Sequence, residues 1–230
     1  MSEVLKPEIV FPKEIKETPG ILRIGVDLDG NVDEIDTWTC RLIKRGLGVK
    51  VDLRKGVINF WLDKLPEIQQ IPGGPAFVNQ IFEKSFIYET AKPIPGAVET
   101  LNKWKDQNHQ IWFITARPKE SLDQITFDWL DRNGLKWAKD KVFFREFWGE
   151  DRTQFKADKA AMLNLHVLIE DYADTVRMCH SSLMMVKLVL KYPWNVTEVI
   201  GPQAVRVNNW QEMDKIIQDT SRWHYFLHSK

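Results

Sequence analysis

One stretch, residues 21–30, constrains the fold more than any other, because an apolar run ends there in two aspartates and a glycine. It reads Ile-Leu-Arg-Ile-Gly-Val-Asp-Leu-Asp-Gly. Such a run between turn residues predicts a buried strand, and side chains alternate along a strand, so we expect Asp27 and Asp29 on one side. Two carboxylates at the end of a buried strand repel each other unless a positive charge neutralises them. A hard divalent cation, most often magnesium, would do so. A turn or a calcium loop is the alternative, but the glutamate at the twelfth position of an EF-hand loop is absent.

The composition indicates one globular domain of good size, or one domain with a smaller insert. The chain has 230 residues, of which 43% are hydrophobic, and its 32 Lys and Arg balance 32 Asp and Glu. A neutral chain has no built-in attraction to duplex nucleic acid or to anionic membranes. Two cysteines, Cys40 and Cys179, are too few for a disulfide framework, and no stretch approaches the roughly 20 apolar residues of a membrane span. We therefore expect a cytoplasmic protein without a membrane or duplex nucleic-acid partner, and leave open whether it forms a homodimer.

The order of elements predicts an α/β fold. Residues 1–19 read as an extended arm, and 32–94 as a helical insert with helices over 32–46, 55–65 and 76–87. From residue 95 onwards, helices alternate with strands. The predicted helices are 96–107, 119–133, about 155–164, one after residue 172, and 210–219, and the predicted strands are 110–115, 142–144, 166–169, 183–190 and 204–207. This alternation predicts a mainly parallel sheet covered by helices on both faces.

Chemically active side chains stand where the predicted strands end. Thr115 closes the second strand, and acids close a later strand at Glu170 and Asp171, with Asp174 three positions on. Lys156 lies on the helix before that later strand. Ligands of parallel α/β sheets bind outside the carboxyl ends of the strands. The sequence therefore predicts a site built from acids, a hydroxyl and cations at one sheet edge.

Together these residues resemble the haloacid dehalogenase superfamily, chiefly its phosphatases. Four motifs occur in order: Asp27-Leu-Asp-Gly, an apolar strand ending in Thr115, Lys156, and Leu-Ile-Glu-Asp171 with Asp174. The patterns Ile-Thr-Ala-Arg-Pro and Ile-Glu-Asp look most like the branch of 5'(3')-deoxyribonucleotidases. The resemblance implies a Rossmann-like core over 20–31 and 95–222, a small helical cap over 32–94, and a tail over 223–230.

The resemblance also implies a chemistry for the acids. Asp27 would attack phosphorus and form an aspartyl-phosphate, while Asp29 would serve as general acid and base. Mg²⁺ would lie between Asp27, the backbone carbonyl of Asp29, and Asp171. Glu170 or Asp174 would hold the metal's waters.

Further residues are expected to contact the substrate. The resemblance implies that Thr115 donates a hydrogen bond to a phosphate oxygen and that Lys156 neutralises the charge of the transferring group. Lys159, one turn further along the helix, is the alternative lysine. The expected contacts to substrate come from the turn after the first strand, from the loop after Thr115, and from the insert. They are Gly30, Asn31, Ala116, Arg117, Phe60 and Trp61. Arg117 either grips the substrate or caps its loop. The two insert aromatics either stack on a nucleobase or pack inside the insert.

The expected function is a Mg²⁺-dependent phosphomonoester hydrolase that acts on small phosphorylated substrates. The resemblance to the deoxyribonucleotidase branch favours nucleoside monophosphates as substrates. Alternatives are a phosphatase or phosphomutase for sugar phosphates or other small metabolites, and a non-catalytic binding module that kept the fold. The alternatives stay open because the sequence of the insert shows no pattern that fixes specificity.

Overall fold

The computed structural model of the chain describes residues 20–51, 62–180 and 185–219. The predicted arm, most of the predicted helix over 55–65, the tail, and the two aromatics Phe60 and Trp61 lie outside these residues. In the described part, no helix has the length and apolar character needed to cross a bilayer.

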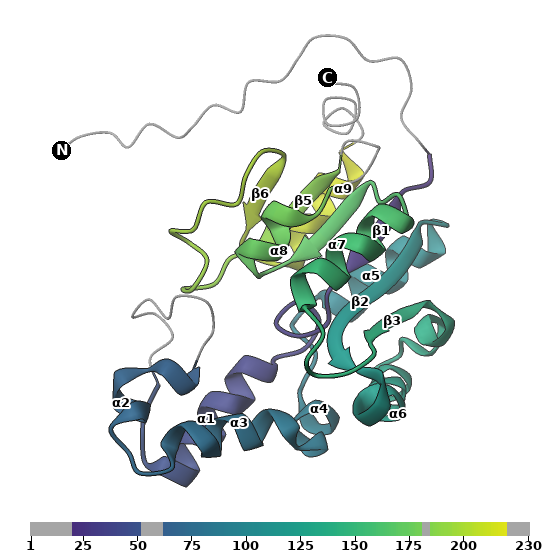
Figure 1. The fold of residues 1–230 in the computed structure, drawn as a ribbon. Coiled ribbons are helices and arrows are strands. Elements are labelled where there is room, and N and C mark those ends of the chain that lie inside the picture. Colours follow the sequence, from purple (N-terminus) through teal and green to yellow (C-terminus); the bar gives the residue numbers. More distant parts are fainter. Residues whose placement is uncertain (1–19, 52–61, 181–184, 220–230) are drawn as a thin grey trace, which may run out of the picture.

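Within the described residues, six parallel strands form one sheet in the order β3-β2-β1-β4-β5-β6 (Figure 1). They are β1 (Arg23–Val26), β2 (Gln110–Pro118), β3 (Val142–Arg145), β4 (Val167–Glu170), β5 (Val186–Leu190) and β6 (Ala204–Val207). The predicted parallel α/β class is thus confirmed. β1 and β4, which carry the acidic motifs, are hydrogen-bonded neighbours at the centre of the sheet.

Alternating side chains place different helices on the two faces of the sheet. Phe113 belongs to the cluster under α5 (Ala97–Asp106), α6 (Lys119–Arg132) and α9 (Trp210–Gln218), whereas its neighbour Ile114 packs with α7 (Arg152–Met162). On the first face the rings of Trp104 and Trp210 have centroids 5.7 Å apart. α8 (Ala173–Met178) packs beside α7. The buried apolar runs of the strands therefore have cover on both sides.

Several boundaries in the core differ from the sequence prediction, most clearly the start of α7 and the end of β2. α7 begins at Arg152, because the side chain of Asp151 accepts hydrogen bonds from the backbone amides of Thr153 and Gln154 and so caps the helix earlier. β2 continues through Arg117 to Pro118 instead of ending at Thr115, and a shift in its register with β3 accompanies the extension. A short η4 turn (Lys136–Lys141), which the sequence did not predict, precedes β3.

The segment after β1 is helical, as expected, and has its own apolar cluster. It comprises α1 (Ile35–Leu47), η3 (Leu62–Lys64), α2 (Pro66–Gln69), α3 (Gly74–Glu83) and α4 (Ser85–Thr90). The single helix predicted over 76–87 is wrong: it is two helices, because Lys84 has an extended backbone between α3 and α4. In Figure 1 these helices lie below the sheet, with α4 beside α6. The division into core and cap domains stays a prediction.

Candidate active site

A tight turn after β1 brings acids from three segments together. The carbonyl of Leu28 accepts hydrogen bonds from the backbone amides of residues 31–33. Gly30 has φ +74°, and a Cβ on it would lie 3.0 Å from Oδ2 of Asp36 and 3.2 Å from Oδ2 of Asp171. The glycine is therefore needed both for the left-handed backbone and for the close approach of two carboxylates.

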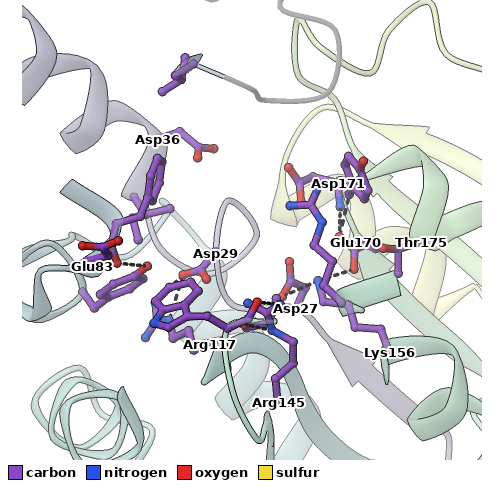
Figure 2. Close-up of a pocket in the computed structure, with 18 of the residues that line it drawn as sticks. Asp27, Asp29, Asp36, Glu83, Arg117, Arg145, Lys156, Glu170, Asp171 and Thr175 are labelled. Atoms are coloured by element: carbon purple, nitrogen blue, oxygen red, sulfur yellow. Dashed lines mark hydrogen bonds and ion pairs between the residues drawn. The ribbon is translucent and has the colours of Figure 1, made fainter. Parts of the chain in front are cut away.

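Lys156 connects the two acidic strand ends (Figure 2). Its Nζ lies 2.9 Å from Oδ1 of Asp27 and 2.8 Å from Oε2 of Glu170. All three side chains are buried. Burial by itself lowers the pKa of Lys156, but the two carboxylates outweigh it and leave the pKa above its ordinary value. The lysine is therefore a fixed positive charge beside Asp27.

The other candidate lysine points elsewhere. Nζ of Lys159 lies over the rings of Phe143 and Phe155, 5.3 and 5.7 Å from their centroids. The structure thus brings Lys156 to Asp27 and holds Lys159 on aromatic side chains of β3 and α7.

Three carboxylates form a cluster that suits a divalent cation. Asp27, Glu170 and Asp171 each offer an oxygen within 4.8 Å of the others. Burial, followed by repulsion from Glu170, raises the pKa of Asp27 well above its ordinary value, and the same two causes raise the pKa of Asp171 to about 7. One lysine does not neutralise this charge, so the donor set fits a hard cation with oxygen ligands.

Arg117 holds the second aspartate of the first motif. Its Nε and Nη2 lie 3.0 and 2.6 Å from Oδ1 of Asp29, and Nη2 also pairs with Asp33. Nη1 donates to Oγ1 of Thr126 at 3.0 Å, and the guanidinium lies 4.7 Å from the ring centroid of Tyr88 in α4. Only 1% of the arginine is exposed. Arg117, which the sequence left between two roles, is here the ion-pair partner of two aspartates.

Removing Arg117 is expected to destabilise the fold. An Arg117→Leu variant leaves Asp33, which is fully buried, without its cation, so we expect a loss of about 3–5 kcal/mol in the free energy of unfolding. The matched control is Arg177→Leu, because Arg177 and Asp174 form a surface pair with 38% and 41% of their side chains exposed, worth at most about 1 kcal/mol. Urea denaturation of both variants tests this, and equal losses would contradict a special role for the buried pair.

The remaining predicted residues are divided between the site and its surroundings. Ala116 lines the pocket described below. Thr115 is buried, and its Oγ1 accepts a hydrogen bond from the backbone amide of Arg117 at 3.2 Å. Asp174 pairs with Arg177 and is not part of the cluster of three carboxylates. The structure therefore does not bring Asp174 to the other acids.

A pocket of about 490 Å³ opens over these acids. Its floor contains Asp27, Asp29, Lys156, Glu170 and Asp171. Further walls come from the helices after β1, from the end of β3 and the segment after it, and from the residue before α8. They include Ile35, Asp36, Leu62, Asp63, Asn79, Phe82, Glu83, Tyr88, Arg145, Trp148, Arg152 and Tyr172. Figure 2 shows Asp36 and Glu83 across the pocket from Lys156 and Glu170. The pocket is thus acidic and cationic at its floor and mixed polar and aromatic at its walls.

Several residues of the site and of the pocket were not predicted from the sequence. Asp33 and Asp36 follow the first motif at short spacing, so the run of four aspartates within 27–36 was the available signal. Burial raises the pKa of Asp33 to about 7, although Arg117 counteracts it, and burial also raises the pKa of Asp36. Trp148, which is 42% exposed, had no such signal, because only the path of the chain after β3 brings it to the pocket.

Comparison with solved structures identifies the class of fold. A haloacid dehalogenase family hydrolase from Deinococcus radiodurans R1, solved with bound phosphate and sodium, has a TM-score of 0.60 and 16% identity, and the match covers 92% of this chain and 99% of that one. The chain has the fold of the haloacid dehalogenase superfamily, as its motifs predicted.

Sequence comparison finds relatives in two Bacillus species. A Bacillus cereus protein and the Bacillus subtilis protein YqfW, each described as a "Putative nucleotidase", are 31% identical over 128 residues and 27% identical over 192 residues. These matches cover 54% and 84% of this chain, and 65% and 91% of the relatives. A family model described as "PITM 1-3, LNS2 domain" matches residues 77–181, less than half of the chain. The chain is thus similar in sequence to proteins that are described as nucleotidases.

Proposed function

We propose that this protein hydrolyses phosphomonoesters through a phosphorylated Asp27, with nucleoside monophosphates as substrates. One observation carries the proposal: at the floor of the pocket, Asp27 lies 2.9 Å from a buried lysine and beside Glu170 and Asp171. The phosphate bound by the Deinococcus radiodurans protein and the descriptions of the Bacillus relatives support it.

In the first half-reaction an oxygen of Asp27 attacks phosphorus, and the bond between phosphorus and the ester oxygen breaks. Lys156 orients Asp27 and offsets the charge on the transferring phosphoryl group. Asp29 gives a proton to the departing alkoxide. Because Oδ1 of Asp29 accepts two bonds from Arg117, Oδ2 is the oxygen left to hold that proton.

In the second half-reaction Asp29 takes a proton from water, and the water oxygen attacks phosphorus. Asp27 leaves as a free carboxylate, and inorganic phosphate is released. Asp27, Asp171 and the backbone carbonyl of Asp29 would hold Mg²⁺. When bound, Mg²⁺ offsets the negative charge of the phosphate and of the acids around it.

The walls of the pocket carry the proposed preference for nucleotides. Phe82 and Trp148 offer aromatic faces, while Asp63, Asn79 and Glu83 offer oxygens to amino and hydroxyl groups. The same oxygens suit the hydroxyls of a sugar phosphate, which is the second candidate substrate class. Phosphate release from a panel of nucleoside monophosphates, sugar phosphates and simple alkyl phosphates, with Mg²⁺ or EDTA, tests the proposal. Magnesium-dependent release that favours nucleotides supports it, and no release from any ester contradicts it.

Trp148 tests the aromatic part of this preference. We expect Trp148→Ala to raise KM for a favoured nucleoside monophosphate about 10-fold, because one stacked base is worth about 1–3 kcal/mol, and to leave KM for glycerol phosphate unchanged. The control is Phe147→Ala, because the neighbouring Phe147 is 53% exposed and is not part of the pocket lining. Equal changes in KM for both esters would remove Trp148 from base recognition.

A further inference from the structure

The side chain of Asn31 lies in the middle of the acidic site. It is fully buried, and its Nδ2 lies 3.3 Å from Oδ2 of Asp27, 3.3 Å from the carbonyl oxygen of Asp29 and 3.1 Å from Oδ1 of Asp171. These three oxygens are the ones that the proposed function gives to the cation. The amide nitrogen therefore contacts every protein oxygen of that set.

The hydrogen bonds of this amide are incompletely satisfied. An NH₂ group has two hydrogens, but here it faces three acceptors, and two of the three distances, at 3.3 Å, exceed the usual range of about 2.7–3.2 Å. The other end of the amide, Oδ1, is buried and has no hydrogen-bond donor among the described residues. Asn31 thus presents a weak donor to two carboxylate oxygens and one carbonyl oxygen, while its own Oδ1 accepts no hydrogen bond from the described residues.

The spacing of these atoms suits a coordination shell. Around a magnesium ion with bonds of about 2.1 Å, adjacent oxygens are about 3 Å apart. The position of Nδ2 lies 3.1–3.3 Å from the three oxygens, so an oxygen placed there would stand beside each of them as a neighbouring ligand. The oxygen and nitrogen of an asparagine amide have nearly the same shape, so a half-turn of the amide exchanges them without repacking.

We propose that Asn31 is an oxygen ligand of the divalent cation, with Oδ1 turned to the position that Nδ2 has between the oxygens of Asp27, Asp29 and Asp171. The inference deepens the proposed function and rests on it. It moves Asn31 from the substrate contacts expected from the sequence to the metal site. The alternative is that Asn31 only holds the acids together and moves aside when the cation enters.

Calorimetric titration of the full chain with Mg²⁺ and with Mn²⁺, after EDTA has been removed, separates these roles. If Asn31 is a ligand, Asn31→Leu, which keeps the number of side-chain heavy atoms but has no polar atom, is expected to weaken cation binding at least 10-fold. Asn31→Asp is expected to tighten it about 10-fold, because it adds a charged oxygen. Asn208→Ala is the control, since Asn208 is exposed and is not part of the pocket lining, and it should leave the dissociation constant unchanged.

Unchanged or tighter binding by Asn31→Leu would overturn the inference, because a cation that loses an oxygen ligand binds more weakly. Weaker binding by Asn31→Leu without tighter binding by Asn31→Asp would also overturn it, because a residue that only holds the acids together gives that result. Circular dichroism checks that the variant is folded. If it is not, Asn31→Asp decides, and unchanged or weaker binding by that variant overturns the inference. If the parent chain binds the cation and neither variant at residue 31 changes that binding, the proposed function stands without this inference. If the parent chain binds neither Mg²⁺ nor Mn²⁺, both the inference and the proposed function are contradicted.

Discussion

Replacing Asp27 with asparagine is expected to lower kcat by at least about 10⁴-fold, because the amide has no oxygen that can attack phosphorus. The fold should survive. Burial and repulsion from Glu170 disfavour the charged form of Asp27, so a neutral side chain of the same shape relieves strain between acids. We expect a melting temperature no lower than that of the parent chain.

The control for this variant is Asp106→Asn, since Asp106 is a surface acid of α5 with 70% of its side chain exposed. Both kcat and melting temperature should stay the same in the control. Substantial turnover by Asp27→Asn would exclude Asp27 as the nucleophile. A loss of turnover together with a large drop in melting temperature would assign the residue a structural role instead.

The second large effect is expected at Lys156, the buried cation between Asp27 and Glu170. Lys156→Met keeps the length of the side chain but removes its charge, so we expect kcat to fall by about 10²–10³-fold. The two buried carboxylates then lack their partner, and the free energy of unfolding should fall by about 3–5 kcal/mol.

Lys159→Met is the matched control on the same helix. Lys159 lies on aromatic rings and not on Asp27, so its replacement should change kcat by less than about 2-fold and stability by less than about 1 kcal/mol. Steady-state kinetics and urea denaturation of both variants measure the two effects. A larger loss of kcat in Lys159→Met than in Lys156→Met would reverse the choice between the two lysines.

The sequence predicted the sheet and the gathering of acids at its edge because both depend on local patterns. Apolar runs alternating with helical periods define parallel strands, and parallel strands place their carboxyl ends together. Asp27 and Asp171 could therefore be expected near one another although they stand far apart in the chain. Each lies directly after a strand, and those two strands are neighbours.

The partners of these acids could not be predicted in the same way. Arg117 reaches Asp29 across 88 positions of the chain, and it does so because β2 continues beyond Thr115. The orientation of the Asn31 amide depends on a turn closed by the carbonyl of Leu28. Such contacts are set by tertiary packing, which periodicity does not report.

The walls of the pocket were the hardest part to predict. Trp148 and Arg152 reach it from the segment after β3, while Asn79 and Glu83 reach it from α3. No motif connects these segments, and their approach depends on how the helices after β1 pack against α6 through residues such as Leu122. Substrate preference is therefore less accessible from the sequence than the chemistry of the floor.

The most direct test of the account is to look for the phosphate on Asp27 itself. The full chain would be mixed with Mg²⁺ and a turned-over nucleoside monophosphate, quenched in acid within one turnover, digested, and mapped by mass spectrometry. The account predicts one phosphorylated peptide, modified at Asp27, that is absent from the Asp27→Asn variant and disappears when turnover is allowed to finish. Active enzyme without any phosphorylated peptide, or with phosphate on another residue, would contradict it.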